Sequence, residues 1–470
     1  MQLSAYGSQD VYLTGNPQIT FFKSVYRRYT NFSMESVEQS IVGTKNFGQR
    51  IECKIQRVGD LLTNLHVYFK LPKLADATFL GGAATSRNWT NAIGYALLKQ
   101  MDLEIGGERI DRQYGKWLDI WNELGDDNGD EHNLVGKVPN PSFKSNQANA
   151  ETDGSGAATT NSFVHDGQQH LDFDQHLDTE YYVPLRFWFC GNPALALPLI
   201  ALQHQDIVLK IDLRALNECY HHRGTAEEIV APSTIELQIY GDYIYLDVDE
   251  RRKFAESSHE YLIEQLQFQS QSISKSTEEV NLNFNHPCKD LIWVFQHTTR
   301  NSAAAAGTGP RIPGDYSDFT NQVANDWFNY NGSAAGPLAL AIPGSAPSGG
   351  ATITSSNAQT ASDPFTTASL QFGGRDRFAA RPPMYFKHLQ PLYHYDNIPS
   401  KNVYAYSFAL KPTEHQPSGT CNFSRLDNAK LVLNGLDLTG AAQNLTISIF
   451  TRNYNVLRIS SGVSGLAYNV

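Results

Sequence analysis

Apolar and polar residues alternate along many short stretches of this chain. In residues 235–240 every second position is Ile or Leu, and the positions between them carry Glu, Gln and Tyr. Residues 445–449 repeat the pattern with Leu and Ile separated by Thr and Ser. Such alternation is typical of antiparallel strands with one buried and one exposed face. Further stretches of this kind lie at 65–71, 101–105, 291–295 and 403–410. The chain is therefore predicted to be all-β.

Two dipeptides between these stretches favour tight hairpins. Gly106-Gly107 separates two apolar runs, and Asn434-Gly435 lies between Leu433 and Leu436. Both dipeptides tolerate the positive φ angles that two-residue hairpin loops require. We expect a β-hairpin at each position.

Helical periodicity is scarce. The clearest case is an apolar stripe at i, i+3, i+4 and i+7 formed by Tyr114, Trp117, Leu118, Trp121 and Leu124. A second short helix is predicted from Asp249 to Ser257, because acidic residues at its start suit the helix dipole. This second helix divides the chain into two nearly equal halves.

Two stretches differ in composition from the rest. Residues 126–180 are rich in Asp, Asn, Gly, His and Gln, and residues 300–384 contain Ala, Gly, Ser and Pro clusters. Both stretches are predicted to be long exposed loops. We expect each loop to lie on its own half of the molecule.

The two halves also end alike. An alternating strand at 234–240 closes the first half, and one at 444–450 nearly closes the second. Each follows a strand that begins near an aspartate, Asp206 in one half and Asp427 in the other. The order predicts a duplicated β-sandwich. A chance likeness between alternating strands is the alternative.

Size and composition agree with two soluble-type domains. A chain of 470 residues exceeds what one core usually supports. Its five cysteines form no C-x-x-C pair, which favours reduced thiols in a cytosol-like compartment. No apolar run of membrane-spanning length and no secretory leader is visible, so neither is expected. The net charge of −11 disfavours binding to nucleic acid over a broad surface.

Candidate chemistry is sparse. Residues Asp126 to Asp130 resemble the start of a calcium loop, but Glu131 and Lys137 replace the glycine and glutamate that the motif needs. His165, His170 and His176 have no common zinc spacing. No nucleophile elbow and no P-loop pattern is present. We therefore expect no catalytic residue, no metal site and no cofactor.

Aromatic clusters and glycosylation sequons are the remaining candidates. Residues Phe187-Trp188-Phe189 and the Trp117/Trp121 pair could stack against sugars, but core packing is favoured for such large rings. Five Asn-x-Ser/Thr sequons occur, at Asn331, Asn31, Asn88, Asn422 and Asn444. Among them Asn331 is the best exposed by prediction, because it lies in the second long loop.

Five longer strings give a family resemblance. They open at Leu13, Phe187, Tyr243, His286 and Gln416, and they read LTGNPQITFFKSVYRRYTNF, FWFCGNPALALPLIAL, YIYLDVDERRKF, HPCKDLIW and QPSGTCNFSR. In this order they closely resemble strings in the major capsid proteins of nucleocytoplasmic large DNA viruses. The landmarks cover nearly the whole chain, and the differences fall in the two long loops.

The resemblance implies two consecutive eight-stranded jelly rolls, the double jelly-roll fold. It suggests an N-terminal segment at 1–25 on the capsid-interior side, a first jelly roll at 26–248, a helical linker at 249–258 and a second jelly roll at 259–470. The resemblance also implies that the chain is a structural protein of the virion. Homotrimeric capsomers would tile an icosahedral shell that is assembled in the cytoplasm of an infected eukaryotic cell.

The resemblance also implies partners. These are further copies of the chain, minor capsid proteins on the inner face and an internal membrane surface, with no sequence-specific nucleic acid binding. Lys23, Arg27 and Arg28 could contact acidic minor proteins or lipid headgroups, although a charge cluster is more often only a solvated face. The open alternatives are a minor or penton-position capsid paralogue, a carbohydrate-binding jelly-roll lectin and a metal-dependent jelly-roll enzyme.

Overall fold

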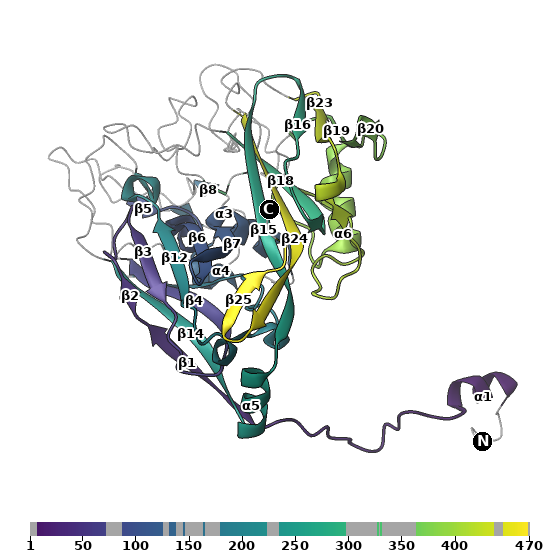
Figure 1. Cartoon of the computed structure of the whole chain (residues 1–470). Coiled ribbons are helices and arrows are strands. Elements are labelled where there is room, and N and C mark those ends of the chain that lie inside the picture. Colours follow the sequence, from purple (N-terminus) through teal and green to yellow (C-terminus); the bar gives the residue numbers. More distant parts are fainter. Residues whose placement is uncertain are drawn as a thin grey trace, which may run out of the picture.

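The computed structural model shows two β-sandwiches packed side by side and an N-terminal arm that extends away from them (Figure 1). The structure describes residues 7–71, 87–125, 131–137, 144–145, 163–164, 179–222, 235–297, 327–328, 330, 363–436 and 445–468.

The first sandwich is built from two facing sheets. The strands of one sheet are β1 (Phe32–Gln39), β4 (Leu61–Leu71), β10 (Thr179–Pro184), β11 (Leu197–Pro198) and β14 (Glu236–Leu246). The strands of the other are β2 (Ile41–Val42), β3 (Arg50–Lys54), β6 (Leu98–Ile105), β7 (Glu108–Tyr114) and β12 (Ile207–Leu213). The sheets have the orders β1-β14-β4-β10, with β11 beside β4, and β2-β3-β12-β6-β7. Two short pairs are separate, β5 (Arg87–Trp89) with β13 (Tyr220–His222) and β8 (Lys144–Ser145) with β9 (Phe163–Val164).

The second sandwich repeats this plan. The strands of its larger sheet are β15 (His259–Ile273), β17 (Pro287–Cys288), β18 (Asp290–His297), β21 (Val403–Ser407), β22 (Cys421–Asn422), β24 (Leu445–Ser460) and β25 (Val463–Leu466). The strands of the facing sheet are β16 (Thr277–Asn281), β19 (Thr367–Phe372), β20 (Arg375–Asp376) and β23 (Ala429–Asn434). The facing sheet has the order β16-β23-β19-β20, and in the larger sheet β24 pairs with β15, β18, β17 and β25.

The strand order is the same in both sandwiches. Eight strands of each half can be numbered along the chain, β1, β3, β4, β6, β7, β10, β12 and β14 in the first, and β15, β16, β18, β19, β20, β21, β23 and β24 in the second. Each half then has one sheet in the order 1-8-3-6 and one in the order 2-7-4-5. This is the topology of a jelly roll. The predicted double jelly roll is confirmed, and the two similar segments that suggested duplication are the seventh and eighth strands of each half.

Alternation of apolar side chains explains why these segments form sheets. In β12 every second residue is buried, and β14 behaves in the same way through most of its length. The inward faces of each sandwich meet in a continuous apolar core. Burial of these faces against each other supplies the main stabilising free energy.

The described residues form six short α-helices: α1 (Ser8–Thr14), α2 (Ile93–Leu97), α3 (Gly115–Leu124), α4 (Glu131–Val135), α5 (Val248–Glu256) and α6 (Gln390–His394). A π-helical turn (Tyr385–Leu389) precedes α6, and α1 lies before the first strand. Both predicted helices are confirmed as α3 and α5. The predicted hairpin at Gly106-Gly107 is also confirmed, because Ile105 pairs with Glu108 and the glycines have φ of 62° and 86°.

Three expectations were wrong. The described strand pairs leave no place for a hairpin partner after Asn434-Gly435, because β23 is paired with β16 on one side and with β19 on the other. The two long stretches are also shorter than predicted, since α4 packs within 126–180 and β19 and β20 form within 300–384. Finally, the described part of the second stretch does not stay on its own half: the Trp327 indole donates to the Glu218 carbonyl oxygen at 2.7 Å.

Candidate assembly surfaces

The two sandwiches share an apolar junction. Helix α3 lies between them (Figure 1). Aromatic rings from both halves meet at this helix. The Trp117 ring packs on Phe450 with centroids 5.5 Å apart, and Phe450 packs on Phe268 at 4.8 Å. One continuous core includes buried residues of both halves. The sandwiches are therefore fixed relative to each other by buried contacts as well as by the α5 linker.

A buried ionic cluster on α3 strengthens this junction. Asp119 is fully buried and accepts hydrogen bonds at 2.8 Å from the Lys401 ammonium and the Tyr330 hydroxyl. Lys137 lies 2.9 Å from Glu123 and 3.4 Å from Asp119. Burial alone would raise the pKa of Glu123, but Lys401, Lys137 and hydrogen bonds lower it to about 2. The cluster joins α3 to the segment that precedes β21.

A second buried ion pair lies inside the second sandwich. Asp290 on β18 is fully buried, and the Arg452 guanidinium on β24 lies 2.5 Å from its carboxylate. The same guanidinium lies 4.0 Å above the Trp121 ring of α3. Lys289 pairs with Glu264 at 2.6 Å, and burial lowers the pKa of Lys289 to about 8. Arg452 thus connects the central strand of one sandwich to the helix of the other.

The edges of two sheets also meet at Asp111 of β7. Its carboxylate oxygen accepts hydrogen bonds from the backbone amides of Leu266 on β15, at 3.1 Å, and Arg112, at 2.9 Å. Burial raises the pKa of Asp111 to about 6, although these donors partly oppose the shift. Nearby, the Lys116 ammonium donates to the Ser448 hydroxyl at 3.1 Å, and burial lowers its pKa to about 7.

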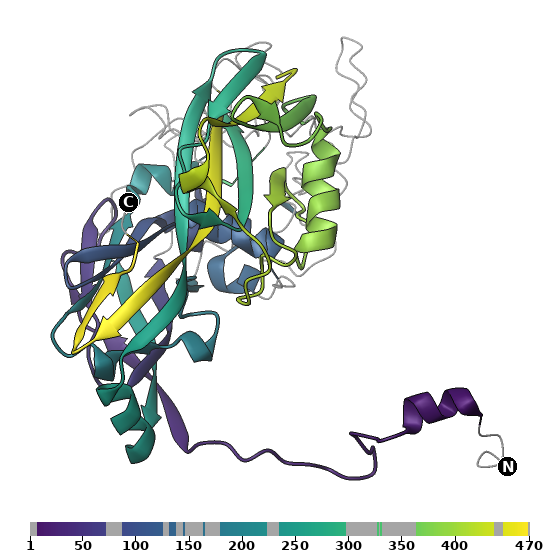
Figure 2. The same cartoon turned by 45° about the vertical axis from the view of Figure 1, so that its right-hand side comes forward.

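The N-terminal arm, residues 7–31, lies outside both sandwiches (Figures 1 and 2). Helix α1 buries no residue, and several large apolar side chains of the arm are exposed, including Phe21 at 89% and Phe22 at 98%. Lys23, Arg27 and Arg28 lie on this arm and are exposed. An apolar and basic segment of this kind is typical of a surface that binds another molecule.

A second exposed apolar patch lies at the outer side of the second sandwich. Leu389, Leu392 and Tyr393 follow each other at i, i+3 and i+4 and are exposed by 39%, 59% and 70%. The His394 ring lies 2.9 Å from the carbonyl oxygen of Leu410, another exposed apolar residue, so the patch continues onto the loop after β21. We call Leu389, Leu392, Tyr393 and Leu410 the α6 patch.

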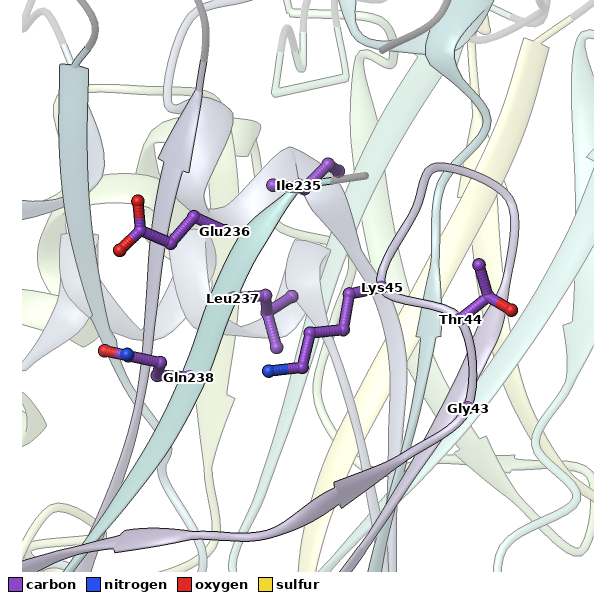
Figure 3. A pocket seen from close by; sticks show the side chains of 7 residues that line it. All are labelled: Gly43, Thr44, Lys45, Ile235, Glu236, Leu237 and Gln238. Carbon is purple, nitrogen blue, oxygen red and sulfur yellow. The ribbon is translucent and has the colours of Figure 1, made fainter. Parts of the chain in front are cut away.

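The hollow in Figure 3 offers little chemistry. It lies between the β2–β3 connection and the start of β14 and is lined by Gly43, Thr44, Lys45 and residues 235–238. Glu236 is exposed and Leu237 is buried, as strand alternation requires. Within the described ranges, no group of three or more His, Cys, Asp or Glu side chains could hold a metal ion. In the same ranges no helix is long and apolar enough to cross a membrane.

The sequence-predicted residues are scattered. Asn31 is exposed at the base of the arm, Asn88 lies in β5, and Asn422 is exposed in β22. Asn331, Asn444, the three loop histidines and residues 126–130 lie outside the described residues. Both Glu131 and Lys137 form ion pairs instead of lying in an exposed acidic loop: Glu131 forms a partly buried pair with Arg186, and Lys137 forms a buried pair with Glu123. Phe187, Trp188 and Phe189 are buried, which confirms core packing.

Sequence reasoning missed the junction charges. Lys289-Asp290 and Arg452-Asn453 interrupt runs that are otherwise apolar or alternating. Charges inside a strand pattern are a signal for buried pairs, because an unpaired buried charge is costly.

Two protein families match this chain. The family described as "Major capsid protein N-terminus" matches residues 20–247, and the family described as "Large eukaryotic DNA virus major capsid protein" matches residues 250–465. Together they cover both sandwiches.

Curated relatives match over the full length. The chain is 40% identical to the major capsid protein of Phaeocystis pouchetii virus, covering 100% of this chain and 99% of the relative. It is 37% identical to the major capsid protein of Paramecium bursaria Chlorella virus 1, covering 99% and 98%. A chain of the PBCV-1 virus capsid, a quasi-atomic model, superposes with a TM-score of 0.69 at 31% identity, covering 96% of this chain and 100% of that chain. The Faustovirus major capsid protein shares the fold, with a TM-score of 0.64, 13% identity and coverage of 97% and 94%.

Proposed function

Since this chain belongs to the major capsid proteins of large eukaryotic DNA viruses, we propose that it acts as a homotrimer whose six sandwiches form one pseudo-hexagonal capsomer. The protein is a structural component of a virion and associates with itself in the capsid shell. The trimer is a more specific proposal than this role in the capsid shell. One observation carries it: both sandwiches of a chain have the same strand order and are fixed side by side.

Symmetry links that observation to the shape of the capsomer. Three copies of a chain with two similar bodies place six similar bodies around one axis. A roughly hexagonal outline follows, and hexagonal tiles can cover a flat facet. The outline depends on a constant angle between the sandwiches, which the buried clusters at Asp119 and Arg452 provide.

We further propose roles for the two exposed apolar surfaces. The α6 patch packs against a neighbouring copy, because relatives of this chain are capsid proteins and subunit contacts bury apolar and aromatic side chains. The arm faces the capsid interior, where its apolar residues and Lys23, Arg27 and Arg28 contact minor capsid proteins or an internal membrane surface.

The remaining assignments follow from this role. We propose the division into an arm at 1–25, a first jelly roll at 26–248, a linker at 249–258 and a second jelly roll at 259–470; the two matched family ranges support it. Assembly takes place in the cytoplasm of the infected host cell. The chain catalyses no reaction and binds no specific nucleic acid sequence, which agrees with relatives named as major capsid proteins.

Size-exclusion chromatography with light scattering tests the trimer. The expected mass is three times 52.3 kDa, and it should persist on dilution. A stable monomer would contradict the proposal. A monomer that also binds sugars saturably would favour the lectin alternative.

A further inference from the structure

Two cysteines face each other at one edge of the second sandwich. Strand β17 pairs with β22 in antiparallel fashion, and Cys288 is directly opposite Cys421. Directly opposite residues of such a pair have Cα atoms about 4.5–5.5 Å apart and side chains on the same face. Disulfides join residues with Cα atoms about 4.4–6.8 Å apart. Both thiols are free in the structure.

The backbone defines the pair more closely. The Phe423 amide donates to the His286 carbonyl oxygen at 3.0 Å, so these two residues form a hydrogen-bonded pair. Pair types alternate along antiparallel strands, which makes Cys288 and Cys421 a hydrogen-bonded pair too, with Cα atoms about 5.5 Å apart. A bond there needs a small approach of the two Cβ atoms. Strand β22 has two residues and lies at the sheet edge, so it can move.

The two thiols differ in access. Cys288 is fully buried, and its Sγ lies 3.5 Å from the carbonyl oxygens of Asn285 and His286. The pKa of Cys288 is raised to about 12, mainly by burial, with smaller contributions from the nearby Asp290 and Cys421. Cys421 is half-buried, and Arg377 partly offsets the increase in its pKa caused by burial. An oxidant therefore meets Cys421 first.

We propose that Cys288 and Cys421 form a reversible cross-strand disulfide when the protein meets a small-molecule disulfide such as oxidised glutathione. The bond would fasten β22 to β17 and thereby to the central strand β24, whose Asn453 pairs with Cys288. The Cβ atoms of a hydrogen-bonded pair lie farther apart than a disulfide prefers, so the bond would be strained and easier to reduce than an unstrained one. Both cysteines belong to one chain, so this proposal does not depend on the proposed trimer.

The reaction is two successive exchanges. The Cys421 thiol loses its proton, and the thiolate attacks one sulfur of oxidised glutathione, whose S–S bond breaks and releases one glutathione thiolate. The Cys288 thiolate then attacks the Cys421 sulfur of the mixed disulfide, and the second glutathione leaves. Two cysteines are oxidised and one glutathione disulfide is reduced to two thiols. Because both steps need a thiolate, the rate should rise about tenfold per pH unit between about pH 7 and 9.

Peptide mapping by mass spectrometry tests the site on the folded full-length chain. After incubation with oxidised glutathione, we expect a linked pair of peptides containing Cys288 and Cys421, loss of two of the five free thiols, and full reversal by dithiothreitol. Oxidation should also shift the unfolding temperature upward, because the bond closes a long loop. Cys421→Ser should abolish the linked pair and the shift, whereas Cys53→Ser, which changes a buried thiol in the first sandwich, should retain both.

Three outcomes would overturn the proposal. One is five free thiols after oxidation of the native protein. The second is a stable glutathione adduct on Cys421 that Cys288 does not resolve. The third is a disulfide between chains or between other cysteines. If Cys421→Ser does not fold, Cys288→Ala serves in its place, and the predicted product is a persistent glutathione adduct on Cys421.

Discussion

Single charged residues have a large effect on this protein because they are buried at the junction of the sandwiches. Asp290 and Arg452 have almost no exposed surface, and each is the main charge partner of the other. Removing one partner of such a pair leaves an uncompensated charge in an apolar environment.

Asp290→Ala should therefore lower the free energy of unfolding by about 3–5 kcal/mol. Arg452 would keep only a contact at 3.8 Å with Glu264 as its charge partner among the described residues. Asp206→Ala is the matched control, because Asp206 pairs with Lys54 on the exposed surface and its loss should change little. Urea denaturation measures both. Equal effects of the two substitutions would contradict the role of the buried pair.

Asp111 should give the stability a pH dependence. Its pKa in the folded protein is about 6, above the unfolded value of about 3.9, so folding takes up a proton between these values. The contribution of Asp111 to the free energy of unfolding is therefore fully present below about pH 4. It is lost as the pH rises through 6, which lowers the free energy of unfolding by up to about 3 kcal/mol.

Asp111→Asn tests this dependence. The amide oxygen can still accept from the Leu266 and Arg112 amides, which both bind the same carboxylate oxygen. Urea denaturation across pH 4–7 should show the stability of the wild type falling relative to that of the variant. A constant difference would show that Asp111 does not titrate in this window.

These residues mark the limit of prediction from sequence at this scale. Lys137 is in a polar stretch that indicated an exposed loop, yet it is buried between Asp119 and Glu123. Cys288 and Cys421 are far apart in the chain, and only strand pairing brings them together. Local patterns cannot show such long-range contacts.

Strands, helices and turns could be predicted where the sequence of the element itself determines its conformation. Helix α3 could be predicted from the sequence, because the apolar stripe that packs on both sandwiches lies within the helix itself. The Gly106-Gly107 hairpin could be predicted because the turn itself requires positive φ angles. Asn434-Gly435 has the same local signal, and Gly435 does adopt a φ of 66°. The neighbours of β23 come from distant segments, however, so turn chemistry alone predicted the wrong partner.

The arm is an element whose removal should separate folding from assembly. Deletion of residues 1–31 should leave the unfolding temperature of the purified protein unchanged, because α1 buries no residue. The same deletion should abolish incorporation into particles. A substitution of Lys23, Arg27 and Arg28 by Gln tests the charges separately. A deletion variant that still enters particles at the wild-type level would contradict the proposed role of the arm.

At the scale of the whole molecule, the repeated strand order was predictable because its last two strands look alike in both halves. The surfaces that join copies were not, since an exposed Leu392 and a buried leucine look the same in a sequence.

Leu392→Glu should weaken association without unfolding the chain. Leu392 is 59% exposed in the single chain, so the charge costs little there, but it would be buried between copies. Light scattering over a concentration series should show dissociation at concentrations at which the wild type stays assembled. Val248→Glu at the start of α5 is the matched control, because Val248 is 65% exposed and lies in another element of the chain. Unchanged association of Leu392→Glu would exclude the α6 patch from the contact.

Cryo-electron microscopy of the purified assembly tests the central claim most directly. The account predicts a particle with three chains in which six sandwiches surround one threefold axis, with the same angle between the two sandwiches in every chain. A particle with another number of chains, or chains in which the two sandwiches adopt different relative orientations, would contradict it.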